Sequence, residues 1–267
     1  MPGQGKRKKL GQHFLADPAI AQRIAQACGA GPGDTIVEIG PGKGALTGPL
    51  LDTGARVIAL ELDEELFRYL NRIYNGRENL SVVRANALKY DYTTLPAPFR
   101  VASNLPYSVA APIIKTLIDH KKVITSMTLM TQKEVAQRLC ATAGDDGYGS
   151  LSVFVGYHCQ AEYLFDVPPR AFRPWPKVDS AVIRLTPWPS PPAMVAEEDG
   201  FFRLVQAAFA HRRKTIKNNL ALLWPDQESF LSSLEAASVT PSMRAEEITM
   251  GQFASLYEGL IKAQAGR

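Results

Sequence analysis

The 267-residue chain is 46% hydrophobic and 21% charged with a net charge of +4, an ordinary globular composition with room for one large and one small domain. No apolar run approaches the roughly 20 residues that span a bilayer, and no apolar segment follows the basic N-terminus as it would in a signal peptide. The three cysteines are widely spaced and form no zinc or disulfide pattern. We therefore expect a cytoplasmic protein without a metal or a membrane anchor.

Helix and strand patterns alternate along the first half of the chain. A helix is expected over 17–28, where Asp17 can act as N-cap and Pro18 suits the first turn. Strands are expected at 35–39, 56–60, 80–84, 100–103 and 126–131, and further helices at 45–52, 64–74, 110–120 and 134–141. A spacing of about twenty residues between strand ends predicts an α/β fold with a parallel, doubly wound sheet.

The second half has a different organisation. Two strands, 160–167 and 179–186, are expected to pair antiparallel at one edge of the sheet, and the Pro-rich segment 187–192 reads as a linker. Helices are predicted beyond it at 199–210, 215–222, 227–236 and 252–263. The predicted domains are a basic arm (1–16), a large α/β domain (17–187) and a small helical domain (188–267).

Positive charge is segregated along the chain. One basic run lies near the N-terminus, and another lies in the acid-free stretch 201–224; the candidate contact residues are Lys6, Arg7, Lys8, Lys9, Arg212, Arg213, Lys214 and Lys217. Segregated positive charge fits a polyanion partner. The alternative for each run is an ordinary solvated surface.

A glycine-rich loop, Glu38 to Gly44, follows the first expected strand. Its GxGxG spacing differs from the dinucleotide GxGxxG, and Glu38 would repel a pyrophosphate but suits a ligand with cationic groups. Glu61 ends the second strand and could accept bonds from ribose hydroxyls, whereas Asp63 is better explained as a helix cap. Asn86 follows the third strand and could bind an adenine amino group, or it could be a simple turn residue. The alternative for the glycine-rich loop is a purely structural turn.

The tetrapeptide Asn104-Leu105-Pro106-Tyr107 follows the fourth strand. An amide beside a backbone carbonyl can bind an exocyclic amino group, and the tyrosine ring can stack on the base that carries it. Because the carboxyl ends of parallel strands meet at one sheet edge, this turn should lie near Glu61 and Asn86. The pattern indicates a site that binds a nucleobase.

Five motifs in order resemble the ribosomal RNA adenine dimethyltransferases. They are 11–15 (GQHFL), 37–47 (VEIGPGKGALT), 104–107 (NLPY), 171–180 (AFRPWPKVDS) and 209–220 (FAHRRKTIKNNL). The resemblance covers nearly the whole chain. It implies a Rossmann-like class I methyltransferase fold with a small C-terminal helical domain, S-adenosylmethionine as cofactor, and dimethylation of adenosine N6.

The resemblance also implies site residues. The catalytic set is Asn104, Leu105, Pro106, Tyr107 and Phe172, with Tyr107 and Phe172 on opposite faces of the target base. The alternatives are a core aromatic under the turn for Tyr107 and a buried anchor for Phe172. The cofactor set is His13, Leu15, Glu38, Gly40, Gly42, Gly44, Glu61, Leu62, Asn86, Ala87 and Asn104. Asn86 stands where the family commonly has Asp, and His13 stands where Asn is commoner, so we expect cofactor binding to survive with altered affinity. His211 stands where Gln is common, a departure that bears on RNA contact more than on the chemistry.

The bacterial branch of the family methylates two adjacent adenosines near the 3′ end of small-subunit (16S) rRNA and acts late in subunit assembly. The resemblance therefore implies a monomeric enzyme whose partner is the small ribosomal subunit. The alternatives are a large-subunit (23S) rRNA methyltransferase of the macrolide-resistance type and a non-catalytic assembly or transcription factor. A DNA adenine methyltransferase would need a larger recognition region than the short tail offers, and the loop spacing disfavours a nicotinamide enzyme.

Overall fold

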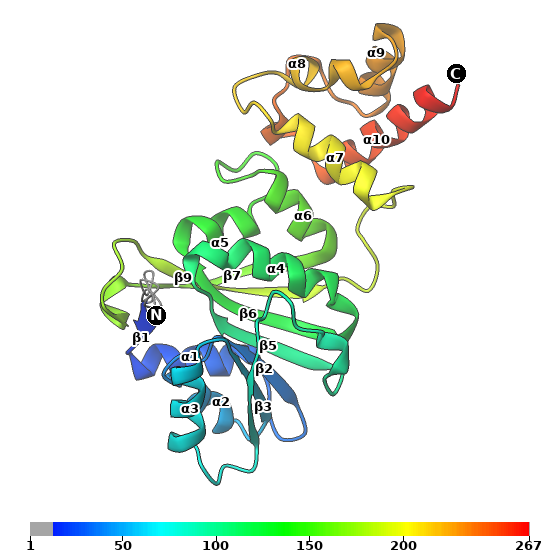
Figure 1. Ribbon diagram of the computed structural model, residues 1–267. Coiled ribbons are helices and arrows are strands. Elements are labelled where there is room, and N and C mark those ends of the chain that lie inside the picture. Colours follow the sequence, from blue (N-terminus) through cyan, green and yellow to red (C-terminus); the bar gives the residue numbers. More distant parts are fainter. Residues whose placement is uncertain (1–12, 267) are drawn as a thin grey trace, which may run out of the picture. The chain divides into compact units, whose positions relative to one another are not determined.

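The computed structural model describes residues 13–266, which form two compact units (Figure 1). Of the described residues, the first unit holds 13–136 and 163–186, and the second holds 137–162 and 187–266. Within residues 13–266, no helix combines the length and apolarity needed to cross a membrane.

A seven-stranded sheet of order β4-β3-β2-β5-β6-β9-β7 is the framework of the first unit. Its strands are β2 (Thr35–Ile39), β3 (Arg56–Glu61), β4 (Leu80–Arg84), β5 (Phe99–Asn104), β6 (Ile124–Gln132), β7 (Cys159–Val167) and β9 (Ser180–Pro187). The five strands from β4 to β6 are parallel, and β9 is antiparallel to β6. The predicted doubly wound sheet is confirmed, and its strand order reverses between β2 and β5.

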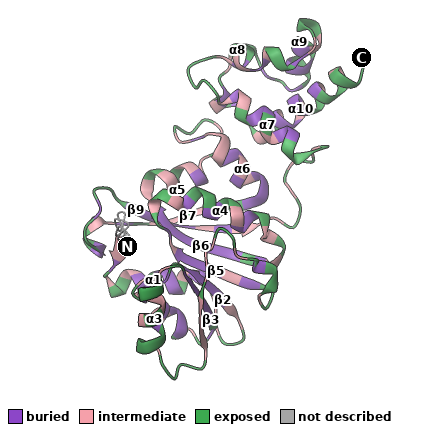
Figure 2. Cartoon of the chain, in the orientation of Figure 1, coloured by how far each residue is buried: buried purple, intermediate pink, exposed green. Residues whose placement is uncertain are grey.

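Helices alternate with these strands. They are α1 (Pro18–Cys28), α2 (Thr47–Leu51), α3 (Glu64–Ile73), α4 (Ala110–Asp119) and α5 (Lys133–Cys140). The Asp17 side chain caps α1 by accepting from two backbone amides, and Asp63 caps α3 in the same way. Gly29 ends α1 with φ +60°, a left-handed conformation that favours glycine. The central strands are buried along most of their length because helices cover both faces (Figure 2).

A second, two-stranded sheet was not predicted. Its strands, β1 (Phe14–Leu15) and β8 (Phe172–Arg173), are antiparallel, with Leu15 opposite Phe172. Figure 1 shows β1 beside the connection between β7 and β9. This pairing attaches the start of the described chain to a segment about 160 residues away.

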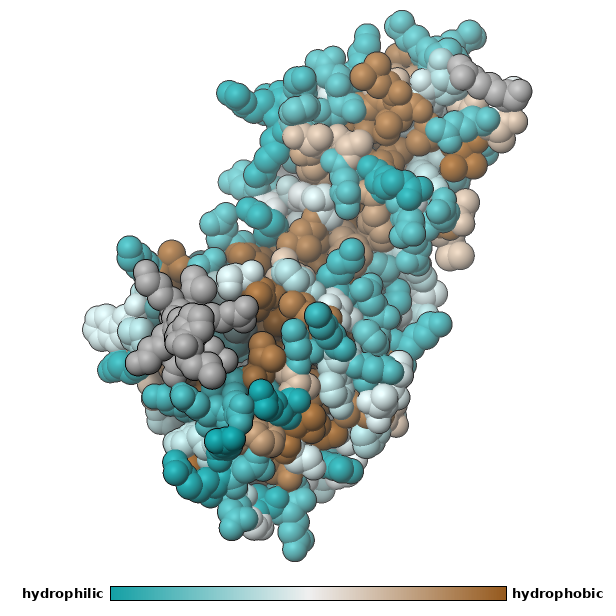
Figure 3. Space-filling model, viewed as in Figure 1, coloured by the Kyte–Doolittle hydropathy of each residue, from teal (hydrophilic) through white to brown (hydrophobic). Residues whose placement is uncertain are grey.

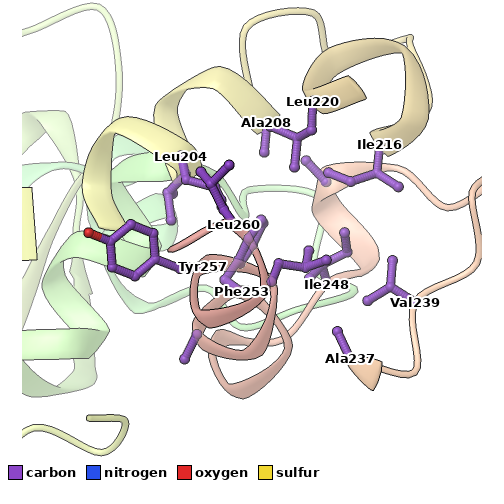
Figure 4. Packing of buried hydrophobic residues seen from close by; sticks show 14 of the residues in the cluster. Leu204, Ala208, Ile216, Leu220, Ala237, Val239, Ile248, Phe253, Tyr257 and Leu260 are labelled. Atoms are coloured by element: carbon purple, nitrogen blue, oxygen red, sulfur yellow. The ribbon is translucent and has the colours of Figure 1, made fainter. Parts of the chain in front are cut away.

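The second unit is helical. Its elements are α6 (Ser150–His158), α7 (Glu198–Ala208), α8 (Ile216–Leu220), α9 (Gln227–Ala236) and α10 (Met250–Ala265). Side chains of α7, α8 and α10, among them Leu204, Leu220 and Phe253, meet in one apolar cluster (Figure 4).

Helix α6 was not predicted, and it explains the composition of the second unit. Val153 and Tyr157 of α6 are buried in the same cluster as Phe201 of α7. Residues 137–162 therefore belong to the second compact unit although they precede the proline-rich linker. The predicted domain boundaries, which divide the chain at the linker, stay a prediction.

Candidate functional site

A cavity of about 290 Å³ lies at the carboxyl ends of the parallel strands. Its lining includes Gly40 after β2, Leu62 after β3, Asn86 after β4 and Leu105 after β5. β2 and β5 are the strands between which the sheet order reverses, the place where open α/β sheets bind ligands.

Most of the predicted site residues line this one cavity. They are His13, Leu15, Glu38, Gly40, Gly42, Glu61, Leu62, Asn86, Ala87, Asn104, Leu105, Pro106 and Tyr107. Gly44 and Phe172 are not part of the lining. The individual roles assigned to these residues stay predictions.

The glycine turn after β2 depends on two left-handed residues. Gly40 has φ +64°, and a Cβ at this position would meet nothing within 4 Å, so the backbone borders open space. Gly42 has φ +59°, and a Cβ there would lie 3.1 Å from the Phe14 ring. The turn needs glycine at 40 for its conformation and at 42 also for close packing.

Gly44 has a structural position. A Cβ there would lie 2.9 Å from the Tyr74 ring, and the Tyr74 hydroxyl donates to the Gly44 carbonyl at 2.9 Å. The residue therefore packs against α3 and its C-cap, on a side of the turn that does not line the cavity. Its predicted contact with the cofactor does not fit this placement.

Two buried carboxyl groups support the turn. Glu38 is fully buried in β2 and accepts from the Thr47 hydroxyl at 2.7 Å. Glu61, at the end of β3, accepts from the Gly42 amide at 3.1 Å and from the Asp63 amide at 2.8 Å. Glu61 thus fixes the glycine turn relative to the neighbouring strand while it lines the cavity.

Burial changes the charge of these acids. It raises the pKa of Glu38 to about 8, although the bond from Thr47 opposes the shift. Burial also raises the pKa of Glu61, against the lowering effect of the backbone amides of Asp63 and Gly42. The raised pKa favours the protonated form of Glu38 in the free protein, whereas a bound cationic group would favour the carboxylate.

The turn after β5 presents two acceptors. The Leu105 amide donates to the Met130 carbonyl at 2.9 Å, which attaches the turn to β6. The Asn104 side-chain nitrogen donates to the His13 carbonyl at 3.4 Å. Among the described residues, no donor contacts the side-chain oxygen of Asn104 or the carbonyl of Leu105, so both are available to a ligand.

Tyr107 is half-buried beside this turn. Its hydroxyl forms a hydrogen bond with the Ser180 hydroxyl at 2.7 Å, and its ring centroid lies 5.9 Å from that of His13. Two contacts therefore fix the orientation of the ring at the cavity. Ser180 was not predicted as its partner, because the pair is separated by 73 residues and has no local sequence signal.

The structure corrects the prediction for Phe172. This residue is completely buried in β8 and belongs to the core cluster of the first unit with Leu15 and Leu46. Its ring does not line the cavity and cannot form the second wall for a base in this arrangement. The side chains that line the cavity near Tyr107 include His13 and Val109.

Phe14 was missed as a lining residue. Its ring packs on Gly42, and the Lys43 ammonium lies 5.0 Å from the ring centroid. The signal was present in the motif at 11–15, which places Phe14 between the two residues that were assigned to the cavity.

Asn86 combines a turn role with a place in the cavity. Its side-chain oxygen accepts from the Leu88 amide at 3.0 Å, and its carbonyl accepts from the Lys89 amide at 2.9 Å. An amide oxygen has two lone pairs, so one remains for a ligand. The turn interpretation and the binding interpretation are therefore compatible.

The basic residues of the second unit differ in their contacts. Arg212 donates to the Asp146 carbonyl at 3.0 Å and lies 3.9 Å from the Glu246 carboxylate, so it is partly structural. Arg213, Lys214 and Lys217 are exposed and pair with no acid within residues 13–266. Hydrophilic side chains cover the visible face around α8 (Figure 3). The predicted contacts of Lys6, Arg7, Lys8 and Lys9 lie outside the described residues.

Comparisons with known proteins agree on one family. The family model "Ribosomal RNA adenine dimethylase" matches residues 3–262. A relative from Alcanivorax borkumensis, "Ribosomal RNA small subunit methyltransferase A", is 44% identical over 253 residues, covering 94% of this chain and 88% of the relative.

Two solved structures extend the similarity. A dimethyladenosine transferase from Plasmodium falciparum is 27% identical with a TM-score of 0.81, covering 94% of this chain and 98% of its own. The 23S rRNA methyltransferase ErmE is 28% identical with a TM-score of 0.75, covering 93% of this chain and 99% of its own.

Proposed function

The chain belongs to the ribosomal RNA adenine dimethylase family, and we propose that it dimethylates N6 of two adjacent adenosines near the 3′ end of small-subunit (16S) rRNA. The observation that carries this proposal is the Asn104-Leu105 turn, whose two free acceptors line the cavity. The A. borkumensis relative, which is named a ribosomal RNA small subunit methyltransferase and is 44% identical to this chain, supports the choice of substrate.

The methyl donor of this enzyme class is S-adenosylmethionine, which supplies an electrophilic methyl group on a sulfonium. The residues present fit it. Gly40 borders open space where a side chain would intrude, and the carboxylate of Glu61 offers acceptors for ribose hydroxyls. Asn86 offers one free lone pair for an adenine amino group, and Leu62 and Leu88 provide apolar surface.

Asn104 and Leu105 would orient the nucleophile. The N6 amine of adenine is a poor nucleophile because its lone pair is delocalised into the ring. Acceptance of its two hydrogens by the Asn104 side-chain oxygen and the Leu105 carbonyl would favour a pyramidal nitrogen and direct the lone pair. Catalysis would then depend on positioning and electrostatics, without a strong general base.

Tyr107 would stack on the target base. The hydrogen bond to Ser180 holds the ring in place, so little conformational freedom is lost when a base binds. Adenosine must leave its stack to reach the cavity. His13, whose ring is tilted 31° from that of Tyr107, replaces Phe172 as the nearest aromatic neighbour of this position.

The exposed cations of α8 and its preceding loop would contact RNA phosphates. Arg213, Lys214 and Lys217 can position a folded RNA without reading its sequence. A substrate of this kind places the enzyme in the cytoplasm during late subunit assembly. We further propose that the enzyme acts as a monomer.

Methyl transfer to isolated ribosomal subunits tests the proposal. Purified protein would be mixed with labelled S-adenosylmethionine and subunits from cells that lack this enzyme. We expect label on small subunits only, and primer extension should stop at two adjacent adenosines near the 3′ end of 16S rRNA.

Each alternative gives a different result in this assay. Label on 23S rRNA would indicate an activity like that in the name of ErmE. Absence of label from both subunits, with intact binding to small subunits, would indicate a non-catalytic assembly factor.

A further inference from the structure

Trp175 is an exposed tryptophan that belongs to neither apolar core cluster of the described residues. Trp175 lies on the connection between β8 and β9 and is 62% exposed. The other two tryptophans are anchored: Trp188 donates its indole N–H to the Gly156 carbonyl, and Trp224 donates to the Ser233 hydroxyl, each at 3.0 Å. Within the described chain, the Trp175 indole N–H has no acceptor. A large aromatic ring left exposed in this way indicates a binding role.

Trp175 is attached to the rim of the cavity. The carbonyl of its neighbour Pro174 forms a hydrogen bond with His13 Nδ1 at 2.8 Å, and His13 lines the cavity. Arg173 pairs with Phe14 across the β1–β8 sheet, and Phe14 also lines the cavity. Two independent contacts therefore hold this segment next to the place where a base would enter.

The charge around Trp175 is positive. The Arg173 guanidinium carbon lies 5.5 Å from the centroid of the indole ring, a cation–π distance. Arg170 and Lys177 are also exposed, and none of the three cations pairs with an acid in the described part of the chain. Asp179, the acid nearest in sequence, joins the segment to α5 through its carbonyl, which accepts from the Lys133 amide at 3.0 Å.

We propose that Trp175 stacks on an RNA base that neighbours the target adenosine, while Arg170, Arg173 and Lys177 contact the flanking phosphates. The Arg173 guanidinium donates to the backbone carbonyls of Arg170 and Phe172 and keeps its positive charge, since no described acid pairs with it. An aromatic face beside such cations matches single-stranded nucleic acid, whose bases stack while its phosphates need positive charge. This inference rests on the proposed function, because it assumes an adenosine in the cavity. It adds a substrate-positioning residue that is separate from the Asn104 turn.

The test compares two substitutions at one exposed position. Trp175→Leu removes the aromatic face, whereas Trp175→Phe keeps a ring that can stack. Loss of one base–aromatic stack changes binding by roughly 5- to 150-fold. For Trp175→Leu we expect an increase of that order in the KM for small subunits, with an unchanged dissociation constant for S-adenosylmethionine; Trp175→Phe should stay close to the wild type.

Fluorescence gives a readout that does not require methyl transfer. A 16S rRNA 3′-end fragment should quench wild-type tryptophan emission, and the quenching should disappear in Trp175→Phe although that variant still binds.

The proposed phosphate contact of Lys177 is tested by Lys177→Gln. Lys122→Gln is its matched control, because Lys122 precedes β6 at the end of the strand away from the cavity. Only Lys177→Gln should weaken RNA binding.

Several outcomes would overturn the inference. An unchanged KM for Trp175→Leu would do so, and so would weaker cofactor binding in parallel, which would indicate a structural residue. Quenching by small-subunit proteins but not by the RNA fragment would show a protein partner. If the wild type fails to methylate small subunits, the proposed function fails, while the quenching titration still decides whether Trp175 binds RNA.

Discussion

The cavity of the first unit and the basic surface around α8 would both contact the substrate, but they differ in the charge and the burial of their side chains. The cavity contains buried acids, Glu38 and Glu61, whose pKa values are raised by burial, and a turn held by backbone hydrogen bonds. The surface carries exposed cations on α8 and the loop before it, with no acid to hold Arg213, Lys214 or Lys217 in one geometry within the described residues.

This difference predicts two kinds of mutational response. In the cavity hydrogen bonds hold the turns that carry the polar groups, so a single change should remove a specific step. On the surface each charge acts through a screened field, so changes should be graded and dependent on salt. Five variants test this contrast, in order of decreasing expected effect.

Asn104→Ala should have the largest effect. It removes the acceptor proposed to orient the N6 amine, and loss of one such preorganised group lowers kcat by about 100-fold or more. Binding of S-adenosylmethionine, measured by calorimetry, should be nearly unchanged. Asn104→Asp keeps an oxygen acceptor and should lose less. Equal loss of transfer and cofactor binding in Asn104→Ala would make this residue structural.

Glu61→Gln should weaken cofactor binding by about tenfold or more, because hydrogen bonds to a charged group are worth roughly 1.5–3 kcal/mol. The Gly42 and Asp63 amides would lose a charged acceptor as well. Equilibrium binding of labelled S-adenosylmethionine measures the change. Glu78→Gln, at an exposed acid before β4, is the control and should bind normally. A wild-type affinity of Glu61→Gln for S-adenosylmethionine would show that Glu61 does not bind the ribose hydroxyls.

The combined change Arg213→Gln, Lys214→Gln and Lys217→Gln should lower RNA affinity roughly tenfold or more at moderate salt. The slope of log K against log salt should decrease by about one for each phosphate that is no longer neutralised. Filter binding at several salt concentrations measures both. Lys262→Gln on α10 is the charge control. A variant with wild-type affinity and slope would return these residues to an ordinary solvated surface.

Glu38→Gln should alter the pH dependence of stability. The pKa of Glu38 is about 8 in the folded protein against an ordinary 4.5, so the folded state keeps a proton that the unfolded chain releases. Stability from this group therefore falls as pH rises from about 4.5 to about 8, by up to about 1.4 kcal/mol per pH unit, and is level above that. Urea unfolding at pH 5, 6.5 and 8 should show a flatter profile for Glu38→Gln. Parallel profiles for both proteins would contradict the raised pKa.

Asn86→Asp should have the smallest effect, a few-fold gain in cofactor affinity. An aspartate can still accept from the Leu88 amide, so the turn is kept, while a charged acceptor binds an amino group more strongly. Asn86→Ala loses the turn and should bind more weakly. A weaker Asn86→Asp complex would show that the amide of this chain is itself adapted to the cofactor.

Much of the fold could be predicted from the sequence because local signals agreed with the global architecture. Asp17 and Asp63 cap helices as their positions indicate, and the spacing of strand ends predicted the parallel sheet. The polar residues at three strand ends converge on one cavity for the same geometrical reason.

The features that were not predicted share a physical cause, because they depend on contacts between segments distant in the sequence. The strands β1 and β8 have two residues each and no periodicity, so only their pairing defines them. The same pairing buries Phe172, which sequence alone placed at the base. Helix α6 is apolar around much of its surface, so it has no amphipathic pattern to detect, yet it completes the core of the second unit.

The β1–β8 pairing also sets an order of events during synthesis. His13, Phe14 and Leu15 line the cavity, but their partners at 172–174 leave the ribosome about 160 residues later. At 5–20 residues per second that delay is roughly 8–30 seconds. The wall they form is therefore among the last parts of the first unit to be completed, and we expect a nascent chain shorter than this to bind cofactor more weakly than the finished enzyme does. Cofactor binding by arrested nascent chains of increasing length would show the point at which this wall is complete.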